Sequence, residues 1–142
     1  MFEGQRSVPN TDENILRAIE LTQKLDASYS GTDILTPLQS IFQKGQPSDC
    51  SESHILLLTA SDVHNFQSVV DIIGDNSQLN HRLHTFGIGN AVSKRLIKTG
   101  AIKGLGNYHL SASGDDLSEK MVSIITDPKP CYTVLQSIRI YD

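Results

Sequence analysis

The sequence predicts an α/β fold built on a three-layer, mainly parallel sheet. Helical and strand-type segments alternate along most of the 142 residues. Residues 55–58 are a continuous apolar run, as expected of a strand covered on both faces. Two later strand-type segments border glycine-containing turns and are separated by a helical pattern. Strands that alternate with helices in this way are typical of parallel βαβ units.

Two helices are predicted before the first strand. Apolar residues recur at helical spacing over residues 15–25, and a second apolar stripe covers residues 34–42. Asn10 with Glu13 three residues later has the form of a capping box, and Thr11 is an alternative N-cap. Two helices are therefore expected to precede the first strand of the sheet in the chain.

The remaining elements follow in alternation. Residues 44–53 are rich in Gly, Pro and Ser, which predicts a surface loop. The predicted order after this loop is a strand at 55–58, a helix at 66–74, a strand at 82–88, a helix at 92–97, a strand at 107–112 and a helix at 117–125. Residues 134–140 carry apolar residues at even spacing, which predicts one more strand in a different layer.

Composition excludes several classes of protein. The formal net charge of −4 gives no reason to expect a nucleic-acid partner. The small basic cluster of Lys94, Arg95, Lys98 and Lys103 is interpreted as a solvated helix face. No apolar run reaches the roughly 18 residues needed to cross a bilayer, and the N-terminus lacks a signal-peptide pattern. With two isolated cysteines and no CxxC spacing, we expect an intracellular, cytoplasmic protein without membrane insertion.

No catalytic or cofactor motif stands out. The Gly87-Ile88-Gly89 turn lacks the third glycine of a dinucleotide fingerprint, because position 92 is Val92. The five histidines are not expected to cluster, and His81 and His84 should point to opposite faces of a strand. Residues 61–64 include a serine, an aspartate and a histidine, the residue types of a hydrolase triad. Residues this close together in the chain rarely form such a triad. We therefore expect neither an enzyme nor a bound cofactor.

Three segments resemble von Willebrand factor type A domains. They are YSGTDILTPL at residues 29–38, ILLLTASDV at 55–63 and HTFGIG at 84–89. The similarity is closest to the subgroup of inter-α-trypsin inhibitor heavy chains and vault poly(ADP-ribose) polymerase. It implies that residues 1–128 form the C-terminal half of such a domain and that residues 129–142 begin a following β segment.

The same resemblance implies a metal-binding edge that has lost most of its ligands. The family's opening DxSxS motif is absent, and Ala60 stands where the family has a ligand aspartate. Thr32 matches the family's threonine, and Asp62 matches a non-ligand acidic position. Mg²⁺ needs several hard oxygens, which Thr32 and Asp62, the weak candidates, do not supply alone. Asp33 and Asp62 are interpreted as helix-start residues, so we expect no metal.

These observations favour a non-catalytic protein-interaction or structural subunit, docked to or completed by another chain in a hetero-complex or homo-oligomer. Two alternatives remain: a Mg²⁺-dependent ligand-binding module completed in trans, and a fragment of a larger multidomain protein. Ligands gather at the carboxyl ends of strands in open α/β sheets. The predicted contact residues at this edge are Ser30, Gly31, Thr32, Asp33, Ala60, Ser61, Asp62, His64, Asn65, Gly89 and Asn90.

Overall fold

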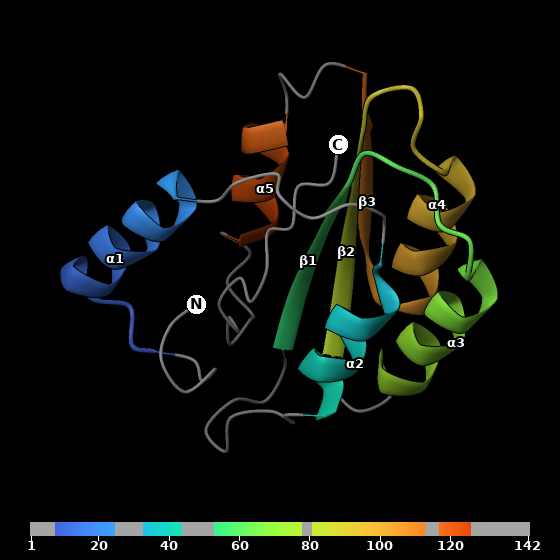
Figure 1. Ribbon diagram of the computed structural model, residues 1–142, viewed down its shortest axis with the longest axis horizontal. Helices are drawn as coiled ribbons and strands as arrows, with labels where there is room; N and C mark the ends of the chain where they lie inside the picture. The colour runs from blue at the N-terminus through green and yellow to red at the C-terminus, as the bar shows by residue number, and fades with distance from the viewer. Residues whose placement is uncertain (1–7, 25–32, 44–52, 78–80, 113–116, 126–142) are drawn as a thin grey trace.

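The computed structural model describes residues 8–24, 33–43, 53–77, 81–112 and 117–125 (Figure 1). Helices and strands follow one another in the predicted order. They are α1 (Asp12–Gln23), α2 (Leu35–Gln43), β1 (Ser53–Thr59), α3 (Phe66–Ser77), β2 (His81–Ile88), α4 (Lys94–Lys103), β3 (Leu105–Ser111) and α5 (Leu117–Ile125). The further strand predicted in the tail and the domain boundary at residue 128 lie outside the described residues.

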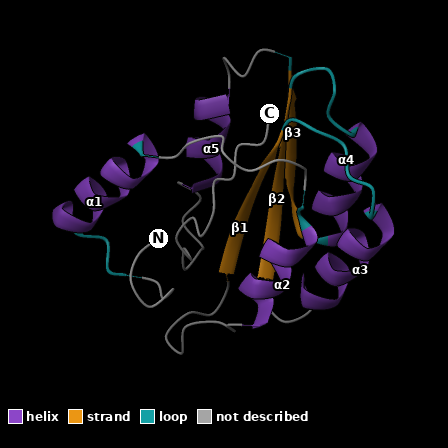
Figure 2. Cartoon of the chain, viewed as in Figure 1, coloured by secondary structure: helices purple, strands orange, loops and turns teal. Residues whose placement is uncertain are grey.

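Within the described residues the sheet has three parallel strands in the order β1-β2-β3 (Figure 2). Thr59 at the end of β1 is opposite Gly87, and Ile88 at the end of β2 is opposite Ser111. All three strands therefore end at the same edge of the sheet. The predicted parallel α/β fold is confirmed.

Helices lie on both sides of this sheet (Figure 1). The helices α3 and α4 pack against β2 on one face, and α2 packs against α3. Ser123 of α5 shares a hollow with His54 and His84, whose side chains lie on the opposite face. The arrangement has the three layers that the sequence predicts.

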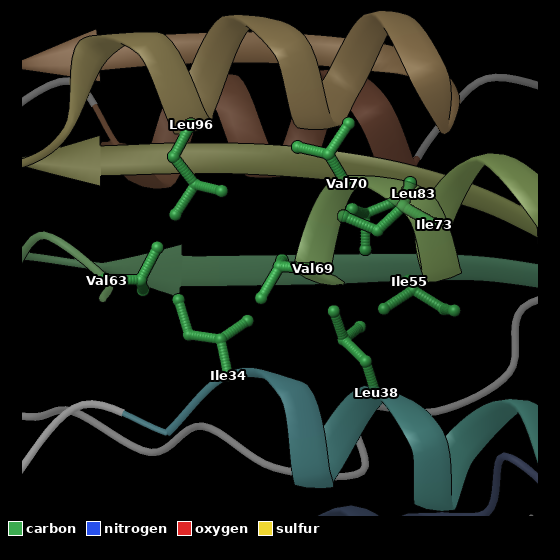
Figure 3. Close-up of a cluster of buried hydrophobic side chains, with 9 residues drawn as sticks. All are labelled: Ile34, Leu38, Ile55, Val63, Val69, Val70, Ile73, Leu83 and Leu96. Atoms are coloured by element: carbon green, nitrogen blue, oxygen red, sulfur yellow. The ribbon is translucent and has the colours of Figure 1, made fainter. Parts of the chain in front are cut away.

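The main core lies between the sheet, α2 and α3 (Figure 3). Side chains from α2, β1, α3 and β2, from the residue before α2 and from the loop after β1 interdigitate there, and α4 contributes one more. They are Ile34, Leu38, Ile55, Val63, Val69, Val70, Ile73, Leu83 and Leu96. Burial of these apolar side chains supplies the main favourable term in folding.

The strand β1 is less covered than its apolar sequence suggests. Only Ile55 of the run 55–58 is buried, whereas Leu56, Leu57 and Leu58 are half-buried. The reason is the position of β1 at the outer edge of the described sheet. The expectation of a strand covered on both faces is therefore wrong for the described structure.

The first helix has a good start signal but no buried residue. Thr11, the alternative cap, is the N-cap: its side-chain oxygen accepts a hydrogen bond from the Asn14 N–H at 3.3 Å. The apolar stripe is exposed, with Ile15 at 46%, Leu16 at 62% and Ile19 at 47%. Helical periodicity thus located the helix correctly, and the described elements leave its apolar face open to solvent.

Candidate functional site

The predicted contact residues that the structure describes lie at the carboxyl ends of the strands. The pairing of Thr59 with Gly87 places the loop after β1 beside the loop after β2. Asp33, just before α2, lines the same apolar hollow as Thr59. The structure therefore brings Asp33 and both loops to one edge. Ser30, Gly31 and Thr32 lie outside the described residues.

A local turn shapes the first loop. The Thr59 hydroxyl accepts a hydrogen bond from the Ser61 N–H at 3.3 Å and lies 3.4 Å from the Ser61 carbonyl oxygen. Thr59 is buried and Ala60 is half-buried, so the methyl group of Ala60 occupies the position where the resemblance places a carboxylate. A methyl group presents no lone pair to a cation or to a hydrogen-bond donor. Ala60 therefore offers no ligand atom from its side chain at this position.

Both nearby aspartates are engaged by backbone groups. Asp33 Oδ1 accepts a hydrogen bond from the Thr36 N–H at 3.1 Å in the first turn of α2. Asp62 Oδ1 accepts one from the Val63 N–H at 2.8 Å. The interpretation as a helix-start residue is confirmed for Asp33, whereas Asp62 bonds the next residue in the loop and does not cap α3, which begins at Phe66.

The described residues do not fit the family's Mg²⁺ site. Such an ion needs near-octahedral oxygen ligands. Among the described residues no three His, Cys, Asp or Glu side chains come together as a metal site would require. Asp33 and Asp62 each have one oxygen bound to a backbone N–H, and Ala60 contributes none.

The second loop depends on a glycine. Gly89 has a φ of 81°, in the left-handed region that residues with a Cβ rarely adopt. Its N–H donates a hydrogen bond to the Ser111 carbonyl oxygen at 2.8 Å, which holds the loop against the end of β3. Asn90 beside it is exposed. The prediction of a turn glycine is confirmed for Gly89, whereas Gly87 lies within β2, where a Cβ would meet the Leu110 side chain at 2.7 Å.

The loop 60–65 ends at the start of α3. His64 is exposed, and Asn65 is half-buried with its carbonyl oxygen accepting the first helical hydrogen bond from Val69 N–H at 3.1 Å. Val63 is buried in the core and so holds the loop against it. His64 and Asp62 are thus presented to solvent on a loop fixed at both ends. Their role as contact residues stays a prediction.

One polar cluster was missed by sequence reasoning. His54 Nδ1 and His84 Nε2 are 2.9 Å apart, and the two rings stack with centroids 5.1 Å apart. The Asn107 N–H donates to His84 Nδ1 at 3.0 Å. A neutral His84 therefore carries its proton on Nε2 and donates it to His54. The expectation that no histidines cluster is wrong for this pair.

The pair forms at the amino ends of the strands, away from the predicted contact edge. His84 is opposite Leu56 in the parallel register, so His54 and His84 lie on the same face two positions apart. The sequence could have predicted this contact only if the register between β1 and β2 were known, because the two histidines lie on different strands. His81 points to the other face and meets the ring of Phe42, as its odd spacing from His84 predicts.

Comparison with known proteins supports the resemblance. No family model matches the chain. It is 38% identical over 96 residues to the rat von Willebrand factor A domain-containing protein 5A, covering 65% of this chain and 11% of that protein. It is 30% identical over 112 residues to the mouse protein 5B1, covering 78% of this chain and 9% of that protein.

A relative from Dictyostelium discoideum extends the same picture. It is von Willebrand factor A domain-containing protein DDB_G0292028, 28% identical over 115 residues, covering 81% of this chain and 12% of the relative. The chain thus spans about a tenth of the length of these relatives. Together with the parallel α/β sheet, these similarities make the chain a relative of the von Willebrand factor A domain-containing proteins, homologous to a segment of them.

Proposed function

We propose that this chain is a non-catalytic protein-interaction or structural subunit that works without a metal of its own and is completed by or docked to another polypeptide. Its relatives carry von Willebrand factor A domains, and such domains commonly mediate protein interactions. The single observation that carries the proposal is the outer edge of β1, which pairs with no second strand among the described residues.

The edge of β1 is apolar and only partly covered. Leu56, Leu57 and Leu58 are half-buried. They line a hollow of about 50 Å³ together with Pro37 of α2 and with Ile34, the residue before that helix. An exposed strand edge offers backbone N–H and C=O groups to another chain. An added strand would pair with these groups and cover the leucine side chains at the same time.

The helix α1 supplies a second apolar surface on this side of the sheet (Figure 1). Ile15, Leu16 and Ile19 are all close to or above half exposed. Contiguous exposed apolar residues at helical spacing mark an interaction surface more often than a solvated one. A polypeptide that extends the sheet beyond β1 would have this stripe available to cover one of its faces.

Non-catalytic and metal-free action are parts of the same proposal. The support is the engagement of Asp33 and Asp62 by backbone N–H groups and the methyl group at Ala60. Those contacts shape the loops and leave them suited to recognition by surface complementarity.

The test is the assembly state of the isolated chain, measured by size exclusion with light scattering and by amide exchange of β1. We expect oligomers or a co-purified polypeptide, and fast exchange at β1 in any monomer. The double variant Leu16→Ser and Ile19→Ser should shift the population towards monomer, whereas the exposed-site control Glu20→Gln should not. A stable monomer with protected β1 amides would overturn the proposal.

A further inference from the structure

We propose that the outer ridge of α4 and the adjoining part of β3 form a second docking surface, for an acidic peptide segment with apolar side chains. The surface consists of Lys94, Lys98 and Ile102 on α4 and Tyr108 on β3, and is called the α4 ridge. It is independent of the β1 edge, which lies at the other side of the sheet.

Charge is strongly segregated along this acidic chain. Residues 76–114 contain no Asp or Glu, although the whole chain has 16 acidic and 12 basic residues. Five of the 12 basic residues, four of them on α4, lie in this segment. The segment that forms β2, α4 and β3 is therefore positively charged within a protein whose net charge is −4. Such a local field attracts acidic partners and rejects basic ones.

The α4 helix turns these charges outwards in a defined row. Leu96, Ile97, Gly100 and Ala101 are its buried residues, whereas Lys94, Lys98 and Ile102 recur every fourth position on an exposed ridge. Ile102 is 68% exposed, and Tyr108 beside the ridge is 47% exposed. The surface therefore combines two exposed ammonium groups with an exposed isoleucine and an exposed tyrosine.

Aromatic contacts position the cations. Lys98 Nζ lies 5.9 Å from the centre of the Tyr108 ring. Arg95, on the neighbouring flank, lies 4.3 Å from the centre of the Phe66 ring at the start of α3. In the described part of the chain Lys98 contacts an aromatic ring and no carboxylate. A glutamate or aspartate from a partner would meet a pre-positioned ammonium group, and apolar partner side chains would cover Tyr108 and Ile102.

The combination of basic and apolar side chains on the α4 ridge favours a peptide over a nucleic acid as its ligand. Phosphate backbones are bound by dense basic patches, whereas the α4 ridge has only two lysines with an exposed isoleucine and tyrosine. Alternating acidic and apolar side chains match the row in both charge and polarity. The occupant is therefore an acidic protein segment.

The experiment is fluorescence anisotropy of the full chain with a labelled ten-residue peptide in which glutamates alternate with leucine and phenylalanine. We expect a Kd of about 10–100 µM, because a surface of four residues forms only a small interface, and small interfaces are typical of weak, transient complexes. Lys94→Glu with Lys98→Glu should weaken binding about tenfold, and Ile102→Ser about threefold. The matched control Lys120→Glu, on α5, should change it less than twofold, with circular dichroism confirming that all variants fold.

Three results would overturn the inference. One is the absence of peptide binding below millimolar concentration. Another is equal weakening by Lys120→Glu, which would show attraction by overall charge. The third is binding of a different ligand as tightly as the peptide and with the same dependence on Lys98. Such a ligand would be a peptide with serine in place of its apolar residues, or single-stranded DNA of the same charge.

Discussion

At the scale of single residues, Thr85 shows how a buried polar group is satisfied inside the sheet. Its side chain is fully buried, and its hydroxyl donates a hydrogen bond to the Ile97 carbonyl oxygen at 2.6 Å. This bond joins β2 to α4 in addition to their apolar contacts. From sequence, Thr85 is an ordinary strand residue, and its partner twelve positions away is defined only by the packing of the helix on the sheet.

We predict that Thr85→Val lowers the free energy of unfolding by about 1–2 kcal/mol, because the substitution keeps the shape and removes a buried hydrogen bond. Urea denaturation monitored by circular dichroism measures the change. Thr85→Ser, which retains the hydroxyl, is the control and should lose less. Equal stability of Thr85→Val and the unmodified chain would contradict this assignment.

His81 provides a pH-dependent prediction. Burial lowers the pKa of His81 from its ordinary value of 6.5, and its Nδ1 has no hydrogen-bond partner among the described residues. Between the lowered pKa and about 6.5 the unfolded chain binds more protons than the folded one. Stability should therefore be complete above about pH 6.5 and should decline as the pH falls below it.

Urea denaturation of His81→Leu at several pH values between 5 and 7 tests this sign. The variant should show a flatter dependence of stability on pH, because it lacks the group that protonates preferentially in the unfolded chain. His64→Gln, at an exposed histidine, should keep the slope of the unmodified chain. An unchanged slope in His81→Leu would show that other groups cause it.

At the scale of elements, two glycines illustrate opposite demands of the backbone. A Cβ at Gly106 would overlap the carbonyl oxygen of Leu83, where β3 carries a bulge between its pairs with Leu83 and Thr85. A Cβ at Gly74, inside α3, would meet only the Lys103 side chain at 3.6 Å, an ordinary contact. The close approach of Gly106 to Leu83 results from strand pairing and cannot be predicted from the residues around Gly106 in the sequence.

We predict that Gly106→Ala destabilises the fold by about 3 kcal/mol, the upper end for overpacking, because backbone atoms of two strands must separate. Gly74→Ala should be neutral or stabilise by up to about 1 kcal/mol through higher helix propensity. Thermal denaturation of both variants measures the contrast. A similar effect of the two substitutions would mean that the bulge relaxes at little cost.

Also at this scale, the sequence located elements better than it located their surroundings. Thr11 and the apolar spacing place α1 correctly, because capping and periodicity are local properties. The exposure of Leu16 and the partial exposure of Leu57 could not be read from the same patterns. Burial depends on which segments lie across from a helix or strand, and that is decided by topology.

At the scale of the whole molecule, the metal-free proposal has a thermodynamic test. A ligand that binds only the folded state raises its stability by linkage. With Ala60 and the engaged Asp33 and Asp62 at this edge, we predict that 10 mM Mg²⁺ (about a hundredfold over a site of 0.1 mM Kd) leaves the Tm unchanged. Differential scanning calorimetry measures it, with equal ionic strength from NaCl as the control. A rise of several degrees specific to Mg²⁺ would favour the metal-dependent alternative.

The order of elements, the parallel sheet and the turn at Gly89 followed from the sequence alone, because hydrophobic periodicity, caps and glycine turns act over a few residues. The tertiary structure alone decided what those elements contact. It paired His54 with His84 and placed Tyr108 beneath Lys98. It also placed the apolar strand β1 at the outer edge of the described sheet. These features depend on strand register and helix packing, which bring together residues that are far apart in the chain. Local sequence patterns do not specify which distant residues will be in contact.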